Sequence, residues 1–88
     1  MATDRADILR RLRARLTETA SLLGNDASRL SDTDIIPDSG VVDSAGLLEF
    51  VVWYDEAFAL DLQPEEMTID HLGSLAAMAD FALARMRR

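Results

Sequence analysis

The pair Asp43-Ser44 has the residue types and position best suited to chemistry in this sequence. A long polar segment ends at the acid and helical periodicity begins at the serine, so the hydroxyl is expected in the first turn of a helix. Backbone N–H groups are unpaired there and the helix dipole is positive, so a phosphate ester on Ser44 would be stabilised. Gly40 permits a positive φ in the approach, and Gly46 keeps the helix start open. For an isolated Asp-Ser pair, a simple helix cap by Asp43 remains the stronger interpretation.

Other kinds of site fit the sequence poorly. The absence of cysteine and the single histidine exclude disulfides, thiolate metal sites and zinc sites built from several imidazoles. A calcium loop starting at Asp32 fails because its fifth and sixth positions are Ile36 and Pro37. A phosphate-binding loop lacks its glycines and its lysine. A triad of Ser44 and His71 with an acid is formally possible, but nothing suggests an oxyanion hole. We therefore expect no enzyme activity and assign His71 no role.

Charge is distributed unevenly along the 88 residues, whose formal net charge is −7. Residues 1–31 hold 6 arginines and 4 acids, whereas residues 32–84 hold 12 acids and no base. This balance argues against nucleic acid binding through a basic surface. The acidic stretch is interpreted either as a solvated face or as a docking surface for basic partners, and the arginines of residues 10–15 as a solvated helix face. No apolar run could span a membrane and no targeting signal is evident, so a cytoplasmic protein is expected.

Helices account for the remaining pattern, because no run of alternating polarity predicts a strand. A first helix is predicted over 4–22, with Thr3 as its N-cap and Gly24 as its stop. A long loop follows over 24–42, parts of which pack on the core through Ile35, Ile36, Val41 and Val42. The remaining elements are predicted to be a helix over 44–58 capped by Asp43, a brief helix or turn around 65–72, and a last helix over about 75–86 capped by Ser74.

The predicted fold is a single all-α domain over residues 1–88, with its core over about 4–86. It is a four-helix bundle with three long helices, one short helix and a long loop between the first two. The residues predicted to form the core are Ile8, Leu9, Leu12, Leu16, Ala20 and Leu23 in the first helix, Leu47, Phe50, Val51, Tyr54 and Phe58 in the second, and Leu75, Met78, Ala79 and Ala82 in the last.

The segment from Asp38 to Glu49 and its setting resemble the acyl carrier protein family. Members of that family carry a 4'-phosphopantetheine arm on the serine of an Asp-Ser-Leu or Asp-Ser-Met motif. The pair Asp43-Ser44 likewise lies mid-chain, ends the long first loop and opens an acidic second helix. Gly40 lies four residues before the serine, as in D-alanyl and related aminoacyl carrier proteins, whereas fatty acid carriers usually have it three before. The general pattern covers about residues 6–84, and the close part about 38–58.

The resemblance implies a role for each matching residue. Ser44 would carry the arm, which comes from coenzyme A, and Asp43 would help a phosphopantetheinyl transferase hold its magnesium ion. The second helix would be the recognition helix. Its implied partner-binding residues are Ala45, Leu48, Glu49, Val52, Asp55 and Glu56. Ala45 departs from the Leu or Met of the family and Gly46 adds no side chain, which would suit an enzyme that brings its own bulk close to the arm.

The implied function is a non-catalytic carrier that presents an acyl or aminoacyl thioester, with an amino acid favoured over a fatty acyl group as cargo. Nothing in the chain activates the weakly nucleophilic Ser44 hydroxyl, so a separate transferase with Mg²⁺ is required. Its other expected partners are an adenylate-forming or synthetase-like ligase and a downstream acyltransferase or synthase. Met1 and the absence of flanking domains lead us to expect a free-standing monomer. The alternative is an acidic helical docking or regulatory domain without a prosthetic arm.

Overall fold

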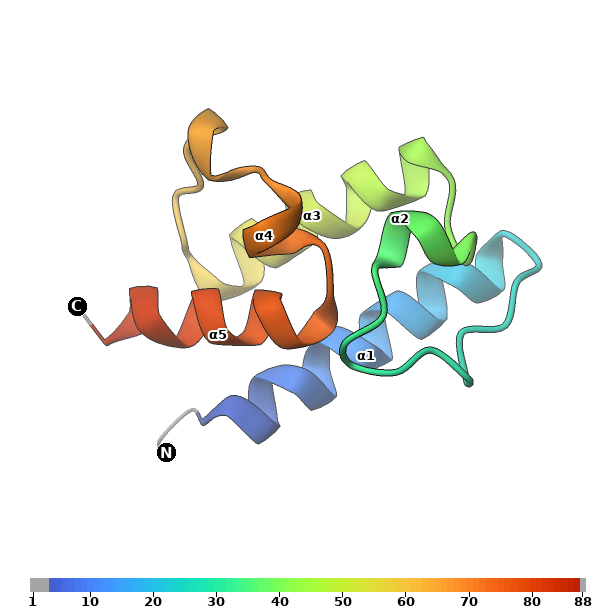
Figure 1. Cartoon of the computed structure of the whole chain (residues 1–88), viewed down its shortest axis with the longest axis horizontal. Helices are drawn as coiled ribbons and strands as arrows, with labels where there is room; N and C mark the ends of the chain where they lie inside the picture. Colours follow the sequence, from blue (N-terminus) through green and yellow to red (C-terminus); the bar gives the residue numbers. More distant parts are fainter. Residues whose placement is uncertain (1–3, 88) are drawn as a thin grey trace.

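The computed structural model describes residues 4–87, and no strand occurs within that range (Figure 1). Its long helices are α1 (Arg5–Leu22), α3 (Ser44–Phe58) and α5 (Leu75–Met86). Between them lie the short helices α2 (Ile36–Ser39) and α4 (Ile69–Leu72) and the 3-10 turn η1 (Pro64–Glu66). The all-helical prediction with three long helices is therefore confirmed. Residues 4–87 contain 5 α-helices rather than the four that were predicted.

The additional helix, α2, interrupts the segment that was predicted to be entirely loop. Pro37 occupies its first turn, where a missing backbone N–H has no cost and the fixed φ of proline suits a helix. Gly40 ends it in the left-handed conformation with φ 74°. Ile36 and Val42 are buried and Ile35 and Val41 are half-buried, so this part of the loop packs on the core as predicted.

At the two ends of α1 the predicted stop is confirmed, whereas the predicted cap lies outside the described residues. Asp4 is the N-cap, because its carboxylate accepts a hydrogen bond of 2.8 Å from the Asp7 backbone N–H. The predicted cap, Thr3, lies outside the described residues. Gly24 ends the helix as predicted, with φ 79° and hydrogen bonds of 3.0 Å from its N–H to Ser21 and 2.9 Å from the Asn25 N–H to Ala20. Leu23, predicted to be core, is 42% exposed because the chain leaves the helix there.

The bounds predicted for α3 and α5 are confirmed. The Asp43 carboxylate accepts from the Gly46 N–H at 2.7 Å, and the Ser74 hydroxyl accepts from the Ala77 N–H at 3.1 Å. Each side chain thus satisfies one of the backbone donors that a helix start leaves unpaired. At the other end of α3, Ala59 adopts φ 51° without being a glycine.

The core lies where α1 packs against both α3 and α5 (Figure 1). The following residues of the three long helices have no exposed surface: Ile8, Leu12, Ala20, Phe50, Tyr54, Leu75, Met78, Ala79 and Ala82. Thr19 is also buried, which the apolar pattern did not indicate. Leu9 and Leu47 are only partly buried and pack at the edge of this cluster.

Arginines of α1 pack on aromatic rings of α3. The Arg11 guanidinium lies 4.6 Å from the centroid of the Phe58 ring, and that of Arg15 lies 5.5 Å from the Trp53 ring. The interpretation of these arginines as a solvated face is therefore wrong for two of them, since each covers an aromatic face with its charged group.

The long loop is tied to the junction between α4 and α5. The Ile36 N–H donates to the Gly73 carbonyl at 2.7 Å, and the Ala76 N–H donates to the Asp32 carbonyl at 2.8 Å. The Arg13 guanidinium also lies 2.7 Å from the Asp32 carboxylate. These bonds hold α2 and α4 in a fixed relation.

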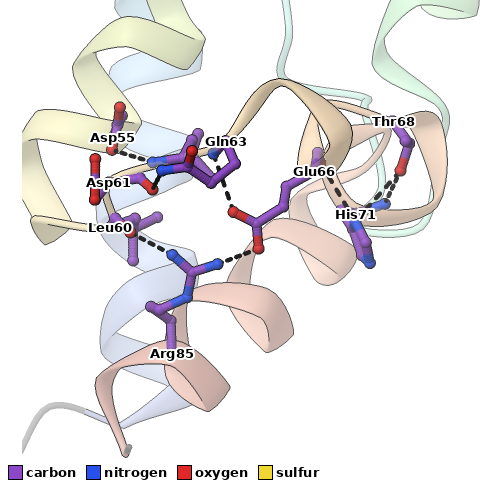
Figure 2. A network of polar contacts seen from close by, with 9 residues as sticks. Asp55, Leu60, Asp61, Gln63, Glu66, Thr68, His71 and Arg85 are labelled. Atoms are coloured by element: carbon purple, nitrogen blue, oxygen red, sulfur yellow. Dashed lines mark hydrogen bonds and ion pairs between the residues drawn. The ribbon is translucent and has the colours of Figure 1, made fainter.

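Polar contacts also hold the connector between α3 and α4 (Figure 2). The Arg85 guanidinium of α5 donates to the Leu60 carbonyl and to the Glu66 carboxylate, which in turn accepts from the Gln63 N–H at 3.0 Å. The Arg85 and Glu66 side chains are 19% and 20% exposed, so this ion pair is partly shielded from water. It fixes the position from which the chain enters the segment Met67–Thr68.

The buried side chain of Tyr54 is expected to make the stability of the fold depend on pH. Its side chain is fully buried and its hydroxyl donates to the Met78 carbonyl at 2.8 Å. Burial raises the pKa of Tyr54 well above its usual value. The folded state therefore keeps its proton when the unfolded chain has lost it. Stability is expected to be independent of this group below about pH 10 and to fall above it by up to about 1.4 kcal/mol per pH unit.

The variant Tyr54→Phe is expected to lose about 1 kcal/mol at neutral pH, because the hydrogen bond is gone. Its stability should then fall less steeply than that of the wild type above about pH 10, because the chain has no other tyrosine. Urea unfolding at pH 7 and at alkaline pH, followed by the fluorescence of Trp53, measures both effects. An equally steep alkaline fall in the variant would contradict the assignment to Tyr54.

Candidate functional site

Ser44 is the first residue of α3, and its side chain is exposed to solvent. Within residues 4–87 its hydroxyl has no hydrogen-bond partner. The capping hydrogen bond at this helix start is made by the neighbouring Asp43, whose Oδ1 accepts from Gly46. Because Asp43 makes the capping bond, the Ser44 oxygen is left free to be esterified at the positive end of a 15-residue helix.

An apolar cavity of about 290 Å³ opens beside Ser44. One wall is α3, through Ser44, Leu47, Leu48 and Val51; the opposite wall comes from other parts of the chain, Pro37 of α2 and the residues Met67, Thr68, Ile69 and Leu72. Among residues 4–87 no charged side chain lines it. The cavity was not predicted, because its two walls are far apart in the sequence and only the loop and connector contacts bring them together.

Large apolar side chains are exposed around the mouth of this cavity. Leu48 is 58% exposed, Met67 49% and Ile69 62%, and the neighbouring Val52 of α3 is 48% exposed. Large apolar side chains such as these are more often buried in the protein interior. Together they define an apolar patch next to Ser44 that is available for contact with another molecule.

A second cavity, of about 170 Å³, lies on a different face of α3. It separates the end of α1, at Leu22 and Leu23, from the start of α3, at Asp43, Ala45, Gly46 and Glu49. We call it the α1–α3 groove. A Cβ at Gly46 would lie 3.1 Å from Leu23 Cδ1, so the two helices approach closely at its floor. Ser44 therefore stands between two hollows of different lining.

The residues expected to contact partners are mostly accessible. Ala45, Leu48, Glu49, Val52 and Glu56 are all exposed. Glu49 lies 3.8 Å from the Arg15 guanidinium, yet its side chain remains 68% exposed. Asp55 differs: it is half-buried and its carboxylate accepts from the Leu62 N–H at 3.2 Å, so it supports the connector (Figure 2).

His71 lies apart from this arrangement. It is exposed, and its Nδ1 lies 3.4 Å from the Thr68 hydroxyl (Figure 2). Its ring centroid lies 5.0 Å from that of Phe81. In the described part of the chain no hydrogen bond joins it to Ser44. The structure therefore offers no link between the serine and an imidazole base.

No family model, curated protein or solved structure matches this chain. The site is accordingly interpreted from its own geometry. Over residues 4–87 no three histidine or acidic side chains gather as a metal site. None of the described helices has the length and apolar character needed to cross a membrane.

Proposed function

We propose that this chain is a carrier protein in which Ser44 is the attachment point of a 4'-phosphopantetheine arm, whose thiol carries an acyl or aminoacyl group as a thioester. The observation that carries the proposal is the exposed Ser44 hydroxyl, free of hydrogen bonds at the capped start of α3. A phosphodiester there gains from the helix dipole. The absence of cysteine from the chain requires that the thiol be supplied by the attached group.

The residues around Ser44 fit such an attachment. None of the described residues that line the apolar cavity is charged, and the neighbouring Ala45 is small and exposed. Asp43 uses Oδ1 for its capping bond. Its second carboxylate oxygen is therefore available to a magnesium ion held by a phosphopantetheinyl transferase, since hard cations prefer such oxygens. Within residues 4–87 no side chain accepts a hydrogen bond from the Ser44 hydroxyl, so the transferase must take its proton.

The apolar cavity supports a cargo with an uncharged side chain. Its lining would accept apolar atoms, whereas an ammonium group would find no acid there and would remain in solvent. An amino acid remains our favoured cargo over a fatty acyl group, because the spacing between Gly40 and Ser44 resembles that of aminoacyl carrier proteins. A carrier with this surface would be loaded by an adenylate-forming or synthetase-like ligase and unloaded by an acyltransferase or synthase. We place it in the cytoplasm as a monomer.

A docking or regulatory domain without an arm is the second candidate function. The observation that favours it is the apolar patch of Leu48, Val52, Met67 and Ile69, which could bind a partner whether or not Ser44 is modified.

Intact-mass measurement separates the two candidates. Incubation of the chain with coenzyme A, Mg²⁺ and a broad-specificity phosphopantetheinyl transferase is expected to add one 4'-phosphopantetheinyl group to each molecule. Omission of coenzyme A is the control and should leave the mass unchanged. A mass that stays unchanged in the complete reaction would remove the carrier proposal and leave the docking domain.

A further inference from the structure

The α1–α3 groove combines three properties of a docking site next to Ser44. It is hollow because the small side chain of Ala45 leaves space beside the end of α1, whereas Leu23 already packs over Gly46. One edge is apolar, since Leu22 is 80% exposed and Leu23 42% exposed. The other edge carries the exposed carboxylates of Asp43 and Glu49.

The apolar edge is exposed for a structural reason. Gly24 turns the chain sharply at the end of α1, so Leu22 and Leu23 are the last side chains before the loop. The core is already filled at that level by Leu16, Thr19 and Ala20. Two adjacent leucines at the surface cost stability in water and would be covered favourably by an apolar side chain of another molecule.

The charge of the groove restricts what can occupy it. Among the described residues no basic side chain lines it; the Arg15 guanidinium lies 3.8 Å from the Glu49 carboxylate and packs on the Trp53 ring. A second copy of the chain would bring two sets of the same carboxylates together, and each copy has a net charge of −7. Because like charges across an interface are unfavourable, a basic partner fits better.

Resting on the proposed function, we propose that the enzyme that esterifies Ser44 inserts into the α1–α3 groove an apolar side chain flanked by lysine or arginine. Such an enzyme must approach the Ser44 oxygen closely, and the groove lies beside that residue on α3. The apolar side chain would fill the space beside Ala45 and contact Leu22. The basic groups would meet Glu49, because Asp43 faces the magnesium ion of the transferase. The end of α1 thus becomes part of the recognition surface.

The test measures kcat/KM for the transfer of the 4'-phosphopantetheinyl group from coenzyme A to Ser44 by the phosphopantetheinyl transferase. Leu22→Ser removes the apolar edge and is expected to lower kcat/KM by about 5- to 30-fold. Glu49→Gln is expected to lower it about threefold and to weaken its dependence on salt. The matched control is Met86→Ser, because Met86 is 41% exposed at the far end of α5 (Figure 1) and should leave kcat/KM unchanged.

The outcomes separate this inference from the function on which it rests. If the wild type is not modified at all, the carrier proposal fails, and this inference fails with it. If the wild type is modified and Leu22→Ser matches Met86→Ser, the carrier proposal stands and the groove is not a docking site. Sedimentation velocity provides the last measurement. A wild-type dimer that Leu22→Ser converts to a monomer would assign the groove to a second copy and overturn the proposal.

Discussion

Moving the hydroxyl by one residue, in the double variant Ser44→Ala/Ala45→Ser, is expected to lower the rate of esterification at least about 100-fold. Successive residues of an α-helix are about 100° apart around its axis, so the relocated hydroxyl would face the α1–α3 groove instead of the apolar cavity. Both positions are exposed, so the exchange should leave the fold intact. Intact-mass time courses with coenzyme A and the transferase measure the rate.

Two single variants complete that experiment. Ser44→Ala should gain no mass, and Ser28→Ala, at an exposed serine of the loop after α1, should be modified at the wild-type rate. A double variant that is modified as fast as the wild type would show that any hydroxyl near the start of α3 suffices. Modification of Ser44→Ala would show that the attachment site lies elsewhere.

Gly73→Ala is expected to destabilise the protein by about 2–3 kcal/mol. A Cβ at this position would lie 2.4 Å from the Ile69 carbonyl oxygen and 2.7 Å from Ile69 Cγ2. The first of these atoms is backbone, so the turn between α4 and α5 must shift. The same residue accepts the 2.7 Å hydrogen bond from Ile36, so the shift would also loosen the loop. Urea unfolding followed by Trp53 fluorescence measures the change in the free energy of unfolding.

Gly40→Ala is the matched control, because it makes the same chemical change without a steric conflict. A Cβ there would meet no atom within 4 Å, although the positive φ of 74° remains unfavourable for alanine. Its cost should be about 1 kcal/mol, from the backbone alone. If Gly73→Ala costs no more than Gly40→Ala, the close approach to Ile69 is not what requires glycine in the turn.

The helices whose ends carry a local signal could be predicted from the sequence. Asp43 and Ser74 are side chains that cap a helix within three residues, and apolar periodicity continues from each of them. The end of α1 was predicted for the same reason, from Gly24. The helix α2 was missed because four residues are too few to show a period. Pro37 and Gly40 were its only signals, and both also suit a turn.

The candidate site likewise has one part that the sequence could predict and one part that it could not. Ser44 and Asp43 were predicted to be adjacent at a helix start, and the structure places them there. The cavity beside them depends on contacts between segments that are distant in the sequence. Arg85, which holds the connector through Leu60 and Glu66, appeared in the sequence only as one of several terminal arginines. A pattern within one segment contains no information about such contacts.

The loop is tied to the α4–α5 junction mainly through main-chain atoms, the donors being the amides of Ile36 and Ala76. An amide donates equally well whatever side chain it carries, so side-chain replacement at Ala76 or Asp32 leaves these two bonds available; proline as a donor residue would remove one. Natural variation could therefore alter the surface of the loop widely while its course over the protein stays the same. Changes in the side chains of this loop would therefore alter which molecules it contacts without altering its path.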